Sequence, residues 1–117
     1  MTDKLVVLVT CANAAEARRI ARALVQKKLA ACVNVLPPPV HSVYRWKGQV
    51  ESARECFLVI KTSRRRFAAL QKEIVRLHSY EVPEVIALPI AAGSAKYLAW
   101  LAESVRPERT VKSRRKK

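Results

Sequence analysis

The hydrophobic pattern along the chain alternates between strand-like and helix-like segments. Residues 5–11 are apolar and rich in β-branched side chains, which predicts a buried strand. Apolar residues then recur at helical spacing over residues 13–28. Asn13 is a good N-cap residue, and Glu16 stands three residues later, where it would complete a capping box. We therefore expect a first helix that runs from Asn13 to about Lys28.

A long hairpin is predicted in the middle of the chain. Its first strand begins at residues 32–36, is interrupted by Pro37–Pro39 and resumes over residues 40–46. Proline cannot donate a hydrogen bond to a ladder, so this interruption predicts an edge, a bulge or a bend. A turn at residues 47–49 leads into a returning arm over residues 50–62. The arms are longer than a small sheet requires, and part of the hairpin should project from the monomer.

The second half of the chain repeats the same kinds of element. Ser63 can cap a second helix, whose apolar stripe consists of Phe67, Leu70, Ile74 and Leu77. A short strand is expected at residues 85–88. A final helix should follow Gly93–Ser94, with Tyr97, Leu98, Leu101 and Val105 on one side, and Pro107 should stop it.

This order of elements predicts a fold class. Two split βαβ units followed by a helix indicate a ferredoxin-like α+β sandwich, with both main helices on one face of an antiparallel sheet. We expect one domain over residues 1–105 and a basic, disordered tail over residues 106–117, in which Val111 is the only aliphatic residue.

The composition of the chain indicates the cellular compartment in which we expect the protein. No apolar run approaches the ~18 residues of a membrane helix. Residues 5–9 are too short and lack the cleavage site of a signal peptide. The cysteines, Cys11, Cys32 and Cys56, are odd in number and form no CxxC pair, so we expect them to be reduced in the cytoplasm.

The net charge of +14 bears on which partners the chain could bind. Residues 106–117 carry seven basic residues and one acidic residue. Such a balance fits a nucleic acid, an acidic lipid, an anionic ligand or simply a solubility device. Because the chain has no recognisable RNA-binding motif, nucleic acid is expected only through the basic tail.

Binding is favoured over catalysis. With two glycines in the chain, a glycine-rich phosphate loop is excluded, and no cysteine stands at a helix start that would activate its thiol. Imidazole and thiolate suit copper or zinc, so His78 and Cys32 are candidate ligands. The plainer alternatives are a loop histidine bonded to the backbone and a small core cysteine.

Two carboxylates and two aromatics are further candidates. Glu81 and Glu84 bracket a proline and could bind a metal, act as acid and base, or pair with Lys61 and Arg64–Arg66; ion pairing is favoured because cations are in excess. The arginine run itself could be an anion-facing patch or a solvated face. Tyr44 and Trp46 on the projecting hairpin suit a subunit interface.

Several of these segments together resemble the CutA family. They are Lys28–Asn34, Val43–Gly48, Lys61–Thr62, His78–Glu84 and Tyr97–Leu101. The resemblance covers nearly the whole domain. It implies a homotrimer like that of the PII signalling proteins, a role in tolerance to divalent cations, and copper binding as in some members. It also implies a ligand cleft between subunits, with a wall formed by Trp46, Lys61, His78, Tyr80, Glu81 and Glu84.

The copper pattern of the family is carried over residue by residue. It uses a cysteine on the first strand and two adjacent histidines. His78 matches the second histidine, whereas Leu77 and Val9 stand at the other two positions. Cys11 lies two residues after Val9 and so on the same sheet face. The expected metal ligands are therefore His78, Cys11 and Cys32. The alternative is a PII-like regulatory module that binds a small anionic ligand or a partner protein, with the arginine run holding phosphates.

Overall fold

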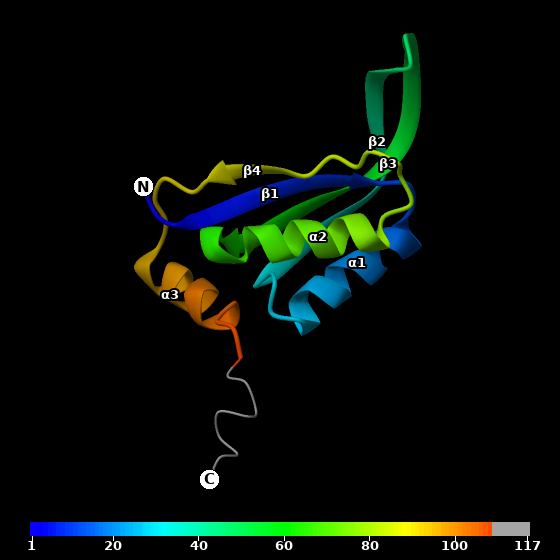
Figure 1. The fold of residues 1–117 in the computed structure, drawn as a ribbon. Coiled ribbons are helices and arrows are strands. Elements are labelled where there is room, and N and C mark those ends of the chain that lie inside the picture. Colours follow the sequence, from blue (N-terminus) through cyan, green and yellow to red (C-terminus); the bar gives the residue numbers. More distant parts are fainter. Residues whose placement is uncertain (109–117) are drawn as a thin grey trace.

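A computed structural model describes residues 1–108 of the chain and shows a four-stranded sheet covered by helices (Figure 1). The strands are β1 (Lys4–Cys11), β2 (Cys32–Trp46), β3 (Gln49–Ser63) and β4 (Ile86–Pro89). Their order is β2-β3-β1-β4, and every neighbouring pair is antiparallel. The predicted ferredoxin-like α+β sandwich is confirmed.

Helices α1 (Ala14–Gln26) and α2 (Phe67–Leu77) pack on one face of the sheet. The strictly alternating burial of β1 explains the core, because every second side chain points under these helices. The buried cluster is formed by the inward residues of β1 and β3 and the apolar stripes of both helices, among them Val7, Val9, Ile20, Leu24, Leu58, Ile60, Leu70 and Ile74. Helix α3 (Ala95–Ser104) forms a smaller cluster, in which Leu101 and Val105 pack with Ala31.

The β2–β3 hairpin extends far beyond the sheet, as expected from its length (Figure 1). The pairing register shifts between Leu36 and Val40, where the three prolines stand. The turn has left-handed backbone conformations at Lys47 (φ 51°) and Gly48 (φ 80°). The projecting arm gives the monomer an elongated shape of 59 × 32 × 23 Å.

Two expected helix boundaries differ from the structure. Helix α1 ends at Gln26, because Lys28 takes a left-handed conformation with φ 60°. A short 3₁₀ turn, η1 (Arg64–Arg66), precedes α2, and Ser63 makes no capping hydrogen bond. Asn13 does cap α1, its Oδ1 accepting from the Glu16 N–H at 2.8 Å. The Glu16 carboxylate completes no capping box, since it bonds to a distant loop.

Candidate functional site

A cleft of about 930 Å³ lies between the hairpin and the loop that follows α2. Its walls are formed by residues 42–46 of β2, by Glu55 in the middle of β3 and by residues 79–84. The lining residues are Thr10, Ser42, Val43, Tyr44, Arg45, Trp46, Glu55, Ser79, Tyr80, Glu81, Val82, Pro83 and Glu84. Four of the expected wall residues, Trp46, Tyr80, Glu81 and Glu84, thus meet in one place.

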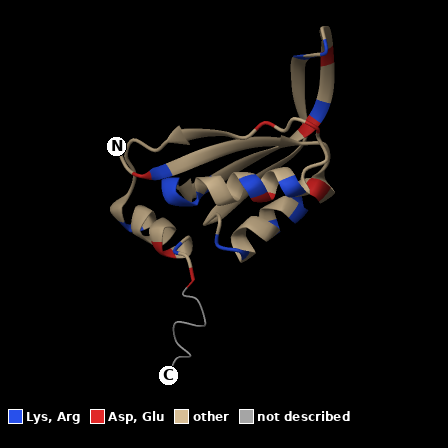
Figure 2. Cartoon of the chain, in the orientation of Figure 1, with Lys and Arg blue, Asp and Glu red and all other residues tan. Residues whose placement is uncertain are grey.

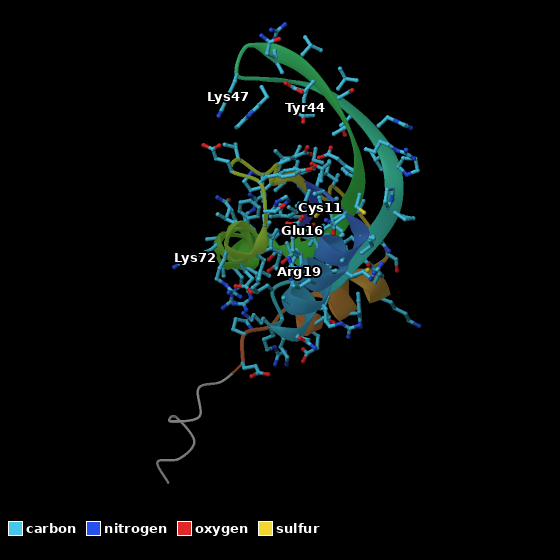
Figure 3. All side chains as sticks on the ribbon, turned by 90° about the vertical axis from the view of Figure 1, so that its right-hand side faces the viewer. Cys11, Glu16, Arg19, Tyr44, Lys47 and Lys72 are labelled. Carbon is cyan, nitrogen blue, oxygen red and sulfur yellow. The ribbon has the colours of Figure 1, made fainter. Side chains whose placement is uncertain are left out.

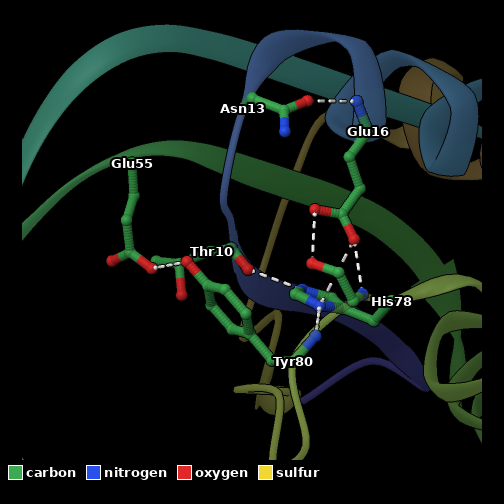
Figure 4. Close-up of polar contacts among 7 residues, drawn as sticks. Thr10, Asn13, Glu16, Glu55, His78 and Tyr80 are labelled. Atoms are coloured by element: carbon green, nitrogen blue, oxygen red, sulfur yellow. Dashed lines mark hydrogen bonds and ion pairs between the residues drawn. The ribbon is translucent and has the colours of Figure 1, made fainter.

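The loop is held in position by the buried carboxylate of Glu16 (Figure 4). This residue is 3% exposed, and it lies in the first turn of α1. One carboxylate oxygen accepts from the Ser79 backbone N–H at 2.5 Å, and the other accepts from Ser79 Oγ at 3.0 Å. Hydrogen bonds to an ionised carboxylate are stronger than neutral ones. The start of the cleft loop is therefore fixed to the helical layer.

His78 contributes to the same anchor through both ring nitrogens (Figure 4). Its side chain is fully buried. The Thr10 carbonyl can only accept, so Nε2 donates to it at 2.8 Å, while Nδ1 accepts from the Tyr80 N–H at 3.1 Å. These contacts define a neutral imidazole with its proton on Nε2. Neither nitrogen has a lone pair available for a metal in this arrangement.

A second anchor connects the loop to the hairpin. The Tyr80 hydroxyl donates to the Glu55 carboxylate at 2.5 Å, and Glu55 is 5% exposed. Burial, and then this hydrogen bond, raise the pKa of Tyr80, so the phenol stays protonated. Glu84 stands near the same carboxylate: partial burial and the charge of Glu55 raise the pKa of Glu84. The cleft thus contains Glu55, which accepts from the Tyr80 hydroxyl, together with Glu84.

The cleft is acidic although the chain is basic. Three carboxylates line it, those of Glu55, Glu81 and Glu84, against one cation, Arg45. Within residues 1–108, neither Glu81 nor Glu84 takes part in an ion pair. The favoured pairing with Lys61 and Arg64–Arg66 is therefore wrong, because these cations lie at the opposite end of β3.

Aromatic rings form the hairpin side of the cleft. Tyr44 and Trp46 remain 45% and 36% exposed, and the ammonium group of Lys47 lies 5.6 Å from the centroid of the Trp46 ring. Such exposed rings on a projecting arm are available to a ligand or to a second subunit.

Lys61 and Cys32 are not part of the cleft. They face each other across β2 and β3, and the Lys61 ammonium group donates to Asn34 Oδ1. Cys11 faces Cys56, which lies five residues from Lys61 along β3. Five residues at ~3.4 Å each span about 17 Å along β3, so Cys32, which pairs with Lys61, lies about that far from Cys11 along the strand direction.

The three expected metal ligands are accordingly not gathered within one chain. Cys11 is fully buried, and burial raises the pKa of its thiol to about 12. Among residues 1–108, no group of three or more histidine, cysteine or acidic side chains is arranged to hold a metal ion. A ligand set of His78, Cys11 and Cys32 stays a prediction, and it would require a rearrangement or residues from another subunit.

Glu55 and the anchoring role of Glu16 were not predicted from the sequence. The capping pattern gave a signal for Glu16, but its partner Ser79 is 63 residues away. Glu55 stands among polar residues of the hairpin arm, and nothing in the local pattern distinguishes it from Glu51.

Comparison with protein families gives a match over residues 5–104 to the model described as CutA1 divalent ion tolerance protein. The divalent-cation tolerance protein CutA of Thermus thermophilus is 48% identical over 99 residues, covering 85% of this chain and 95% of that protein. Protein CutA, chloroplastic, of Arabidopsis thaliana is 48% identical over 102 residues, covering 87% of this chain and 56% of that protein.

Solved structures agree with these matches. The crystal structure of CutA from Xylella fastidiosa superposes with a TM-score of 0.86 at 37% identity, covering 90% of this chain and all of that one (100%). CutA1 from Oryza sativa superposes with a TM-score of 0.86 at 44% identity, covering 92% of this chain and 97% of that one.

Proposed function

Because the chain belongs to the CutA1 family of divalent ion tolerance proteins, we propose that it binds a divalent cation in the cleft and acts by binding, not by catalysis. The observation that carries this proposal is the gathering of three carboxylates, Glu55, Glu81 and Glu84, in one cleft of a chain whose net charge is +14. Only nine acidic residues are present in all, so this local excess opposes the general trend of the sequence.

The donor set favours a cation with oxygen ligands. Glu55 and Glu84 line the same cleft, and partial burial together with the charge of Glu55 raises the pKa of Glu84. A hydrated divalent ion is commonly held by one or two carboxylates and several waters. Glu55 and Glu84 would hold such an ion directly, while Tyr80 keeps Glu55 in place and Glu81 adds negative charge at the rim. Copper held by imidazole and thiolate finds less support, because the nitrogens of His78 are occupied.

Calorimetric titration of the reduced protein with Mn(II) and, separately, with Cu(II) tests this function. The variants are Glu84→Gln, which removes one proposed ligand, and His78→Ala, which removes the imidazole. Glu103→Gln is the matched control, because it removes a carboxylate from the exposed surface of α3.

Saturable Mn(II) binding that is lost in Glu84→Gln and kept in Glu103→Gln supports the carboxylate cleft. Cu(II) binding that is lost only in His78→Ala would instead favour the imidazole–thiolate set. The absence of saturable binding of either metal would overturn the proposal.

A small anionic ligand is the other function that the family resemblance suggests. Arg45 is the one cationic side chain of the cleft, and its Nη1 donates to the Gly48 carbonyl at 3.4 Å. A thermal-shift panel of nucleotides and phosphate gives the direct comparison. A rise in Tm with an anion, and none with a divalent cation, would move the assignment to the PII-like module.

We propose further that the protein is a homotrimer whose subunits complete the cleft. Large apolar side chains stay exposed on the hairpin, the β4 edge and α3; they include Val43, Tyr44, Trp46, Val50, Ile86, Leu88, Tyr97 and Trp100. Exposed apolar side chains of this kind are typical of a surface that contacts another subunit. Light scattering during gel filtration should give three times the chain mass of 13.2 kDa, and a monomer would contradict the proposal.

The cellular location remains a prediction. Relatives are described as chloroplastic in Arabidopsis thaliana and as periplasmic in Archaeoglobus fulgidus. Within residues 1–108, the structure has no helix that is long and apolar enough to cross a membrane. The three cysteines are unpaired, which fits the reducing compartment expected from the sequence.

A further inference from the structure

Arginine and lysine residues recur along α1, η1 and α2, the helical layer on one face of the sheet (Figure 2). We define this basic face by six exposed residues of α1, η1 and α2: Arg18, Arg19, Arg22, Arg65, Lys72 and Arg76. The two carboxylates of these elements do not neutralise it. Glu16 is buried under the layer, and Glu73 is held by Lys27 and Arg76 at 2.8 Å each. Within residues 1–108, the other five cations form no ion pair.

Contacts between the two helices make this face continuous. The first turn of α1 contacts the chain just after α2, through Glu16 and Ser79. At the other end, Arg66 Nε donates to the Lys28 carbonyl at 3.3 Å, just before α2 begins. The helices therefore lie antiparallel and side by side, and α1, with its 13 residues, is about 20 Å long. Figure 3 shows Arg19 and Lys72 on this layer, whereas Lys47 and Tyr44 belong to the hairpin.

Helix stability does not account for the arginines that precede α2. The run Arg64–Arg66 stands at the start of α2, where positive charge opposes the helix dipole, and the first turn of α2 has no acidic residue. Five of the six cations on the basic face are arginines. Arginine binds phosphate oxygens with a planar, bidentate fork. The face is thus suited to a partner that presents many phosphates.

The apolar residues discriminate between classes of phosphate-bearing partner. Val25 and Val75 are the only large hydrophobic residues exposed on α1 and α2, and every exposed aromatic ring lies on the hairpin or on α3. Insertion into a membrane surface requires large apolar side chains beside the cations. Binding of single strands requires aromatic rings on which bases stack. A double-stranded nucleic acid requires only cations placed along its backbone.

We propose that the basic face binds the phosphate backbone of double-stranded nucleic acid without sequence preference. Residues 109–117 carry six basic residues and no acidic residue but lie outside the described part of the chain, so the surface proposed is that of α1, η1 and α2 alone. The cleft and the hairpin take no part, so cation binding and nucleic-acid binding are separable.

Fluorescence anisotropy of a labelled DNA duplex of about 30 base pairs tests the proposal with the full chain, over about 50 to 300 mM NaCl. The test variant is Arg18→Gln/Arg19→Gln/Arg22→Gln, which removes three charges from exposed positions of α1. The matched control, Lys47→Gln/Arg54→Gln/Lys96→Gln, removes three exposed charges from the hairpin and α3. A third variant ends at residue 108. Thermal melts establish that all variants fold.

The expected result is salt-dependent binding that the α1 variant weakens about tenfold at low salt, while the control changes affinity less than about twofold. Each lost phosphate contact should reduce the slope of log K against log salt by about 0.9. Equal weakening in both triple variants would show attraction by net charge alone and overturn the proposal. Binding that is lost on truncation and unchanged in the α1 variant would assign it to the tail instead. Binding to phosphatidylserine vesicles without binding to the duplex would also overturn it.

Discussion

Glu16 shows how one buried carboxylate connects two parts of the molecule. It stands in the first turn of α1, where a negative charge is favourable, and it accepts both hydrogen bonds from Ser79. The loop that carries Tyr80, Glu81 and Glu84 begins at that point. The position of the cleft residues therefore depends on a side chain outside the cleft.

Replacing Glu16 with Gln should lower the free energy of unfolding by about 1–3 kcal/mol, because a neutral amide oxygen accepts from the Ser79 N–H more weakly than an ionised carboxylate does. Urea denaturation followed by circular dichroism measures the loss. Glu103→Gln, at an exposed site, should change stability by less than about 0.5 kcal/mol. Equal stability of the two variants would contradict the anchoring role.

Glu84→Gln should have the opposite effect at neutral pH. The pKa of Glu84 is raised in the folded state, so the ionised side chain destabilises the fold at neutral pH. This destabilisation disappears as the pH falls to the pKa that Glu84 has in the unfolded chain. We expect the variant to melt roughly 1–3 °C higher than the wild type at pH 7 in metal-free buffer. The difference should vanish near pH 4, and a difference that grows on acidification would refute the assignment.

At the residue scale, the sequence predicts a side-chain contact correctly where the two partners are close along the chain. Asn13 was identified as the N-cap, and its side chain does cap α1. The capping pattern also drew attention to Glu16, but Ser79, Tyr80 and Glu55 reach their partners across the fold. Such contacts depend on register and loop path, which no local pattern contains.

At the scale of elements, periodicity identified the α-helices and strands of residues 1–108, and only their ends moved. The alternation in β1 and the stripe in α2 reflect burial directly, since Leu70 and Ile74 are 0% exposed. The proline interruption became a register shift within one continuous strand pair. The 3₁₀ turn before α2 was not predicted, because serine is a common N-cap residue and Ser63 was expected to begin the helix directly. In the structure its hydroxyl is buried without a hydrogen-bond partner among the described residues.

Adjacent positions of α2 offer a test of this burial pattern. Ile74 is 0% exposed and Val75 is 52% exposed. Ile74→Ala should cost about 2–5 kcal/mol, since it leaves a cavity under the sheet, whereas Val75→Ala should stay within about 0.5 kcal/mol. Chemical denaturation of both variants gives the comparison, and similar losses would mean that the helix packs by another face.

At the scale of the whole molecule, charge is separated in space. Three of the nine carboxylates line the cleft, while arginine and lysine residues recur along the helical layer (Figure 2). The sequence revealed the excess charge but not this separation, because the acidic residues are dispersed along the chain between basic ones. The fold brings Glu55 of β3 to the loop that carries Glu84.

The thermal stability of the protein should rise with ionic strength. Repulsion among the unpaired cations of the basic face is screened by salt. Scanning calorimetry between about 20 and about 300 mM NaCl should show an increase in Tm. The Arg18→Gln/Arg19→Gln/Arg22→Gln variant should show a smaller increase, and a fall in Tm with salt would indicate that attractive pairs dominate instead.

The hairpin tip and residue 108 lie on opposite sides of the sheet (Figure 1), which makes the chain convenient for site-specific labelling. Cys11 and Cys56 are buried and should resist alkylation, so Cys32 is the only native thiol that needs replacement among the three. A dye attached through Lys47→Cys would report events at the hairpin, and one through Glu108→Cys would report events at the helical layer. Two colours in one sample could then follow assembly and polyanion capture independently and in real time.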